Sequence, residues 1–166
     1  DEAVFPRSGY GRHKMAMEHV IARSGAPYLI LRLAYPLGPD QPSHQLIPAL
    51  LQQVQQGKAS VRRGVRRDLI DIADVLALTD TLLRRGVRKQ TINMASGFAV
   101  LVEDVVQFLA QRVAHPVAIE YSDGQSEYCV SSERLAQSVD NFASFGFGPH
   151  YYQRVIEKYW PLALER

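Results

Sequence analysis

Cysteine is nearly absent from this chain, because Cys129 is the only one in 166 residues. A single thiol forms no internal disulfide and cannot supply the thiolates of a structural zinc site. Long apolar runs are also missing: none approaches the roughly 20 residues that a membrane-spanning helix needs, and no secretory signal opens the chain. We therefore expect a cytoplasmic protein with no membrane partner.

Two further absences remove whole classes of chemistry. The five histidines are scattered, and His13 and His19 stand six positions apart on one predicted helix, which does not put both on one face for a metal. No Gly-x-Ser-x-Gly pattern surrounds Ser8, Ser131 or Ser132, so no hydrolase nucleophile is indicated. We expect neither a metal site nor a serine hydrolase.

A glycine-rich phosphate turn is missing as well. Neither G-x-x-G-x-x-G nor G-x-x-x-x-G-K occurs in the sequence, although such turns cradle the phosphates of bound nucleotides. The chain opens at residues 1–7 with a polar, proline-containing loop that no predicted strand precedes. We do not expect a complete nucleotide-binding protein to begin in this way.

Positive charge comes mostly from arginine, which supplies 15 of the 19 cations, yet the net charge is only +2. The arginines bunch at 62–67 and 84–89. A nucleic-acid site needs cations gathered on one face together with aromatic or groove-reading partners. No aromatic residue lies in either run, and glycine interrupts both, as is typical of turns. We expect no nucleic-acid partner.

The residues that are present suffice for one good core, since 46% of the chain is hydrophobic. Apolar periodicity predicts helices over 8–24, 46–56, 72–85, 102–114, 133–139 and 151–160. Short apolar runs predict strands over 28–33, 90–95 and 117–121, with a loop at 36–39. We expect the aromatic face of the last helix to dock on the core. Alternating strands and helices indicate an α/β architecture with some parallel pairing.

Tyr10 and Lys14 are the most informative pair in the chain. They stand four residues apart, one helical turn, so the phenol and the ammonium should project from the same face of the helix over 8–24. A free tyrosine titrates near pH 10, and a neighbouring cation can lower that pKa by roughly 1–3 units. A tyrosine tuned in this way can exchange a proton with a substrate hydroxyl. The alternative is a surface tyrosine and a solvated lysine that merely share a helix.

Four blocks of sequence set this pair in a larger pattern. They are Asp1-Glu2 with Pro6 and Tyr10-Gly11-x-x-Lys14 followed by Glu18, then ILRLAYPLGP at 30–39, RDLIDIADV at 67–75, and FGFGP at 145–149 running into 151–160. In this order they resemble the active-site loop and catalytic helix, the substrate strand and loop, the R-D-[FY]-I-x-V-x-D-V block and the closing helix of the extended short-chain dehydrogenases/reductases. This family is also called the NAD-dependent epimerases/dehydratases, and the blocks span nearly the whole chain.

The resemblance implies a fold and a division of the chain. The fold would be the C-terminal part of a Rossmann-type, doubly wound domain followed by a small α/β substrate-binding domain. Residues 1–60 would be the remnant of the dinucleotide-binding domain that carries the YxxxK helix, and residues 61–166 would be mainly the substrate-binding domain, with an approximate boundary because the elements interleave. The family's glycine-rich turn and its catalytic Ser or Thr belong to an N-terminal half that this sequence lacks.

The resemblance also implies the chemistry. In the intact protein Tyr10 would be the acid/base, and Lys14 would lower its pKa and hydrogen-bond the nicotinamide ribose of NAD or NADP. Tyr10 would also belong to the cofactor site. Tyr35 would contribute to both the cofactor and the substrate site. The reaction would be epimerisation, dehydration or keto reduction of a sugar or nucleotide sugar, with hydride passing to or from the nicotinamide. The chain alone would be inactive; the alternative is a non-catalytic binding or assembly module that keeps the substrate-domain fold.

Three positions bear on the substrate. Tyr35 stands where the family usually has an asparagine that helps bind a diphosphate, and Leu37 replaces a usual tyrosine. A tyrosine can donate one hydrogen bond but lacks the paired pattern of an amide. Arg67 matches an arginine that pairs with substrate phosphate, a role that suits a guanidinium fork. A salt bridge from Arg67 to Asp68 or Asp71 is the equal alternative.

Two protein partners follow from the resemblance. One is the missing N-terminal half of the same protein. The other is a second copy of the chain, because the family often dimerises through the region of the opening helix. Met15, Met17, Val20 and Ile21 on that helix could equally belong to an intramolecular core, so a homodimer stays open.

Overall fold

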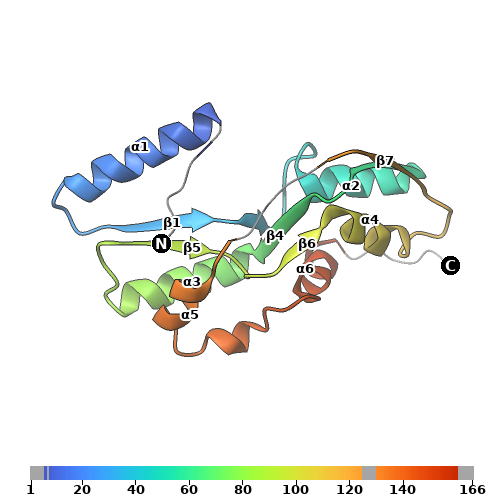
Figure 1. Ribbon diagram of the computed structural model, residues 1–166. Helices are drawn as coiled ribbons and strands as arrows, with labels where there is room; N and C mark the ends of the chain where they lie inside the picture. Colours follow the sequence, from blue (N-terminus) through green and yellow to red (C-terminus); the bar gives the residue numbers. More distant parts are fainter. Residues whose placement is uncertain (1–5, 7, 125–129, 161–166) are drawn as a thin grey trace.

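The computed structural model describes residues 6, 8–124 and 130–160. One or two strands separate successive helices along most of this chain, and three helical segments follow the last strand (Figure 1). The helices are α1 (Gly9–Arg23), α2 (Leu46–Gln55), α3 (Ile72–Arg84), α4 (Val102–Ala110), α5 (Glu133–Ser138), a 3₁₀ turn (Phe142–Phe145) and α6 (Tyr151–Tyr159). The strands are β1 (Leu29–Leu33), β2 (Tyr35–Leu37), β3 (Lys58–Arg62), β4 (Arg66–Asp71), β5 (Gln90–Met94), β6 (Ala99–Leu101) and β7 (Ala118–Ser122). The predicted α/β class with parallel pairing is confirmed.

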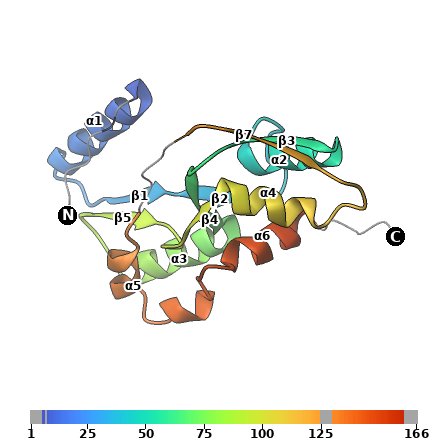
Figure 2. The ribbon, with the colours of Figure 1, turned by 45° about the vertical axis from the view of Figure 1, so that its right-hand side comes forward.

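The first structural unit is a parallel pair of strands backed by helices on one face. β1 pairs with β5 from Leu29 opposite Gln90 to Leu33 opposite Met94. Figures 1 and 2 show α3 and α5 on one side of this pair and α1 on the other. The side that α3 and α5 cover holds a continuous core of Ile70, Val75, Leu78, Leu82, Ile92, Met94, Leu135 and Val139.

A second core lies beyond the end of β1. The chain passes through one residue into β2, which is the edge of a three-stranded sheet in the order β2-β4-β6, while β3 and β7 form a separate parallel pair. Helices α2, α4 and α6 pack here around Ile47, Leu50, Val54, Val105, Val106, Leu109 and Ile156. Strand β4 joins the two cores, because Leu69 belongs to the second and Ile70 to the first.

Helix α1 differs from the other long helices because none of its residues is buried. Met17, Val20 and Ile21 on α1 and Leu33 on β1 are all exposed apolar side chains. In both views the Gly9 end of α1 lies toward the carboxyl end of β1, so the helix runs roughly antiparallel to that strand (Figures 1 and 2). Within the described ranges, no helix combines the length and the apolar character needed to cross a bilayer.

The structure also corrects the predicted face of α3. Helical spacing predicts one face for Ile72, Val75, Leu76, Thr79, Leu82 and Leu83. Leu76 and Leu83 are instead 65% and 48% exposed. The buried positions are Val75, Leu78 and Leu82, at the i, i+3, i+7 spacing of a narrower stripe. The wider assignment failed because leucine at a solvent-facing position looks the same in sequence as leucine in the core.

Candidate functional site

The structure brings Tyr10 and Lys14 together at the first turns of α1. Ser8 caps this helix, with its Oγ accepting the Gly11 N–H at 3.0 Å. Helical spacing then puts the two side chains on one face, and the Lys14 Nζ lies 5.3 Å from the centre of the Tyr10 ring. Tyr10 is 73% exposed, so its phenol is accessible to a ligand.

Tyr35 lies where β1 passes into β2, and its hydroxyl is already engaged. It accepts the backbone N–H of Leu46 at 2.7 Å. That N–H belongs to the first residue of α2, whose preceding residue Gln45 makes no side-chain cap. The phenol therefore caps α2, and it keeps its own O–H free to donate to another group. Whether it touches a cofactor or substrate stays a prediction.

The Tyr35 cap has a measurable consequence. Tyr35→Phe should lower the free energy of unfolding by about 1 kcal/mol, because it removes the acceptor for a helix N-terminal N–H while keeping the ring. Urea denaturation of the variant and the wild type measures this difference. Tyr28→Phe is the matched control, since Tyr28 is also half-buried and the structure gives its hydroxyl no hydrogen bond within the described ranges. Equal losses in the two variants would contradict the capping role.

Arg67 lies on β4, half-buried, with its Nη1 donating to the Arg66 carbonyl at 2.7 Å. The two carboxylates proposed as its alternative partners receive other hydrogen bonds. Those of Asp68 come from Ser96 and Gly97, and those of Asp71 come from Ala73, Lys158 and Tyr159. The phosphate-binding role of Arg67 therefore remains a prediction.

Asp68 ties β4 to the loop between β5 and β6. Its Oδ1 accepts both the N–H and the hydroxyl of Ser96 at 2.9 Å, and its Oδ2 accepts the Gly97 N–H at 2.8 Å. Burial raises the pKa of Asp68, and these hydrogen bonds oppose the rise without cancelling it. Gly97 has a φ of +82°, and an added Cβ would lie 2.5 Å from the Ser132 hydroxyl, so only glycine suits this position.

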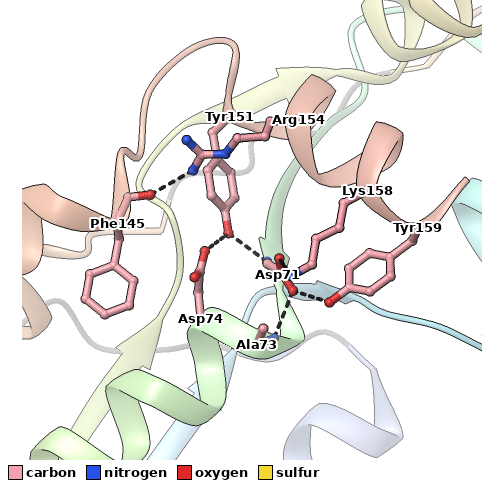
Figure 3. A network of polar contacts seen from close by, with 8 residues as sticks. All are labelled: Asp71, Ala73, Asp74, Phe145, Tyr151, Arg154, Lys158 and Tyr159. Carbon is pink, nitrogen blue, oxygen red and sulfur yellow. Dashed lines mark hydrogen bonds and ion pairs between the residues drawn. The ribbon is translucent and has the colours of Figure 1, made fainter. Parts of the chain in front are cut away.

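A polar cluster that sequence reasoning missed joins α6 to the start of α3 (Figure 3). We call it the α6 cluster, and its members are Asp71, Asp74, Tyr151, Lys158 and Tyr159. Asp71 caps α3 through the Ala73 N–H at 2.8 Å and also accepts from Lys158 at 2.7 Å and Tyr159 at 2.6 Å. The Tyr151 hydroxyl accepts the Asp71 N–H at 2.8 Å and donates to Asp74 at 2.6 Å.

The α6 cluster contains two carboxylates, those of Asp71 and Asp74, and one ammonium, that of Lys158. Burial alone would raise the pKa of Asp71, but the hydrogen bonds from Lys158, Tyr159 and Ala73 outweigh it and lower the pKa. Burial and the hydrogen bond to Asp74 raise the pKa of Tyr151. A surface cavity of about 470 Å³ adjoins the cluster, yet its carboxylates already bind neighbouring side chains. The predicted docking of the last helix is thus confirmed, and hydrogen bonds as well as ring packing hold it.

The chain is similar to known proteins in both sequence and structure. A family model described as the NAD dependent epimerase/dehydratase family matches residues 1–95. A dTDP-L-rhamnose 4-epimerase of Burkholderia thailandensis is 31% identical, over 79% of this chain and 41% of that protein. WbmG of Bordetella bronchiseptica in complex with NAD is 21% identical with a TM-score of 0.76, over 98% of this chain and 54% of that one. RMD of Pseudomonas aeruginosa complexed with NADPH is 24% identical with a TM-score of 0.72, over 83% of this chain and 52% of that one.

The similar structures bear on the fold of this chain, and their lengths show how much of such a protein the chain spans. The solved structures share the arrangement described above, which confirms the predicted fold as the C-terminal part of a Rossmann-type domain with a small α/β domain. The chain spans less than half the length of the curated relative and about half the length of each of these structures.

Proposed function

Because the chain belongs to the NAD dependent epimerase/dehydratase family, we propose that the protein containing it epimerises, dehydrates or reduces a sugar or nucleotide sugar with NAD or NADP. The matched relative is named a dTDP-L-rhamnose 4-epimerase, and one neighbouring structure holds NAD with UDP. A dTDP-glucose 4,6-dehydratase of Bacillus anthracis, with NAD, has a TM-score of 0.71. Each of these names supports a reaction at a sugar carbon next to a nicotinamide.

The contact between Lys14 and Tyr10 is the observation that supports this proposal. The Lys14 Nζ, 5.3 Å from the centre of the Tyr10 ring, puts a cation beside an accessible phenol. Tyr10 would take a proton from a substrate hydroxyl or return one to a substrate carbonyl. A bound nicotinamide supplies the hydride acceptor or donor for the carbon that carries this oxygen.

The residues of this chain fit only part of a dinucleotide. Tyr10 and Lys14 offer a hydroxyl and an ammonium, which suit the hydroxyls of a ribose. The sequence contains no glycine-rich turn for the phosphates. We therefore assign the phosphate cradle to the remaining N-terminal part of the protein, with residues 1–60 completing that domain and residues 61–166 forming most of the substrate side. On this view the isolated chain has no oxidoreductase activity.

Arg67 and Tyr35 are the proposed substrate contacts. The guanidinium of Arg67 would bind a phosphate of a nucleotide sugar, and Tyr35 would donate its remaining O–H to the substrate or cofactor. The enzyme would act in the cytoplasm, where nicotinamide cofactors and nucleotide sugars are available, and a homodimer through α1 is compatible with its exposed apolar residues.

Comparing the whole protein with the isolated chain tests this proposal. Each is incubated with NAD or NADP and a panel of UDP- and dTDP-hexoses, and products and reduced nicotinamide are measured. We expect conversion by the whole protein and none by the chain of 166 residues. Turnover by the chain alone would contradict the proposal that the isolated chain is inactive. A whole protein that binds a nucleotide sugar but neither NAD nor NADP would favour the non-catalytic module instead.

A further inference from the structure

A two-point salt bridge joins α1 to the neighbouring strand β1. The Arg32 Nε donates to both carboxylate oxygens of Glu18, at 2.9 and 3.2 Å, and the Arg32 Nη2 donates to Glu18 Oε2 at 2.6 Å. The side chains are only 20% exposed for Glu18 and 37% for Arg32. The Glu18 hydrogen bond raises the pKa of Arg32, so the guanidinium keeps its charge.

This pair matters because, among the described residues, apolar packing buries no side chain of α1. No residue of the helix is buried, whereas every other helix of nine residues or more buries at least three of its own side chains. A planar guanidinium that grips a carboxylate through two nitrogens restricts the rotation of both groups, unlike a single point charge. The bridge therefore limits both the rotation of α1 about its axis and its sliding along β1.

Glu18 lies on the same face of α1 as Tyr10 and Lys14. Tyr10, Lys14 and Glu18 stand at i, i+4 and i+8, so successive positions differ by only about 40° around the helix. Glu18 lies about 12 Å along the axis from Tyr10. Any rotation of the helix at Glu18 consequently turns the phenol and the ammonium by the same angle.

We propose that Glu18 and Arg32 are positioning residues that orient Tyr10 and Lys14. This inference rests on the proposed function for its chemistry, and on the contacts of α1 for its geometry. A salt bridge of ordinary surface character would contribute little to stability and nothing to turnover. A positioning bridge predicts a loss of turnover instead, because a displacement of about 1 Å at a reacting group can cost up to about 10²-fold in rate.

Arg32→Lys in the whole protein is the test, because it keeps the charge and removes the fork. We expect kcat to fall about tenfold with KM nearly unchanged, and hydrogen exchange of the α1 amides to become faster. Combining Glu18→Arg with Arg32→Glu reverses the two ends of the bridge. The double variant should recover part of the kcat that Arg32→Glu loses on its own. Arg84→Lys is the matched control, since Arg84 pairs with Asp80 on the surface of α3.

Each outcome decides the proposal. Unchanged exchange of α1 in Arg32→Lys would overturn the anchoring, and faster exchange with unchanged kcat would overturn the positioning. Failure of the proposed function itself is seen separately, as full activity of a variant that lacks the Tyr10 hydroxyl.

Discussion

Tyr10→Phe should lower kcat of the whole protein by a factor of about 10²–10⁴, the usual contribution of a positioned general acid or base. The substitution removes the one atom that would exchange a proton with the substrate. It leaves the ring, the cation 5.3 Å from its centre and the helix cap at Ser8 in place. Binding of NAD or NADP, measured by calorimetry, should change by only a few-fold, because the substitution removes a single hydroxyl.

Tyr121→Phe is the control for this prediction. Tyr121 is also partly exposed and also carries a cation over its ring, since the Arg63 guanidinium lies 4.3 Å from the ring centre. It belongs to β7, in a different sheet from β1 and β5. If both variants lost activity equally, the loss would reflect folding. If Tyr10→Phe kept full kcat, Tyr10 would not be the acid/base.

Local patterns predicted the elements that depend on local signals. Helix α1 begins at its Ser8 cap and ends near Gly25, and β1 lies within the apolar run at 28–33. Strands β2, β3, β4 and β6 were not predicted. Strand β2 has three residues with a proline at its centre, and a proline is tolerated there because β2 is at the edge of its sheet. Strands β2 and β6 have three residues each, too few positions to display an alternating pattern.

In the candidate site, too, the sequence predicted contacts between near neighbours but not contacts between distant residues. The pair of Tyr10 and Lys14 could be predicted because one helical turn separates them. The Tyr35 cap could not, because it joins a strand to a helix eleven residues later. The α6 cluster joins Asp71 to Tyr159 across 88 positions, and no local period links such residues. Two of its hydroxyls come from Tyr151 and Tyr159, for which the sequence predicted only ring packing.

The α6 cluster carries the largest expected effect on stability. Asp71→Ala should lower the free energy of unfolding by about 3 kcal/mol, since it removes a helix cap and charge-assisted hydrogen bonds from Lys158 and Tyr159. Asp71→Asn keeps an oxygen for the cap and should cost less, about 2 kcal/mol. Asp80→Asn is the control, because Asp80 forms an exposed i,i+4 pair worth under about 1 kcal/mol. Urea denaturation measures all three.

The pH dependence of the Asp71→Asn difference tests the charge itself. The pKa of Asp71 is lowered in the folded state, so its stabilisation is complete above the unfolded value of about 3.9 and disappears as the pH falls through the folded value. Asp68 acts in the opposite direction, because burial raises its pKa and the folded state gains stability as Asp68 protonates. Both proteins contain Asp68, so its effect cancels when the wild type and Asp71→Asn are subtracted. The difference should therefore be constant from about pH 5 to 8 and shrink below about pH 4; a difference that stayed constant into acid would mean that the Asp71 charge does not hold α6.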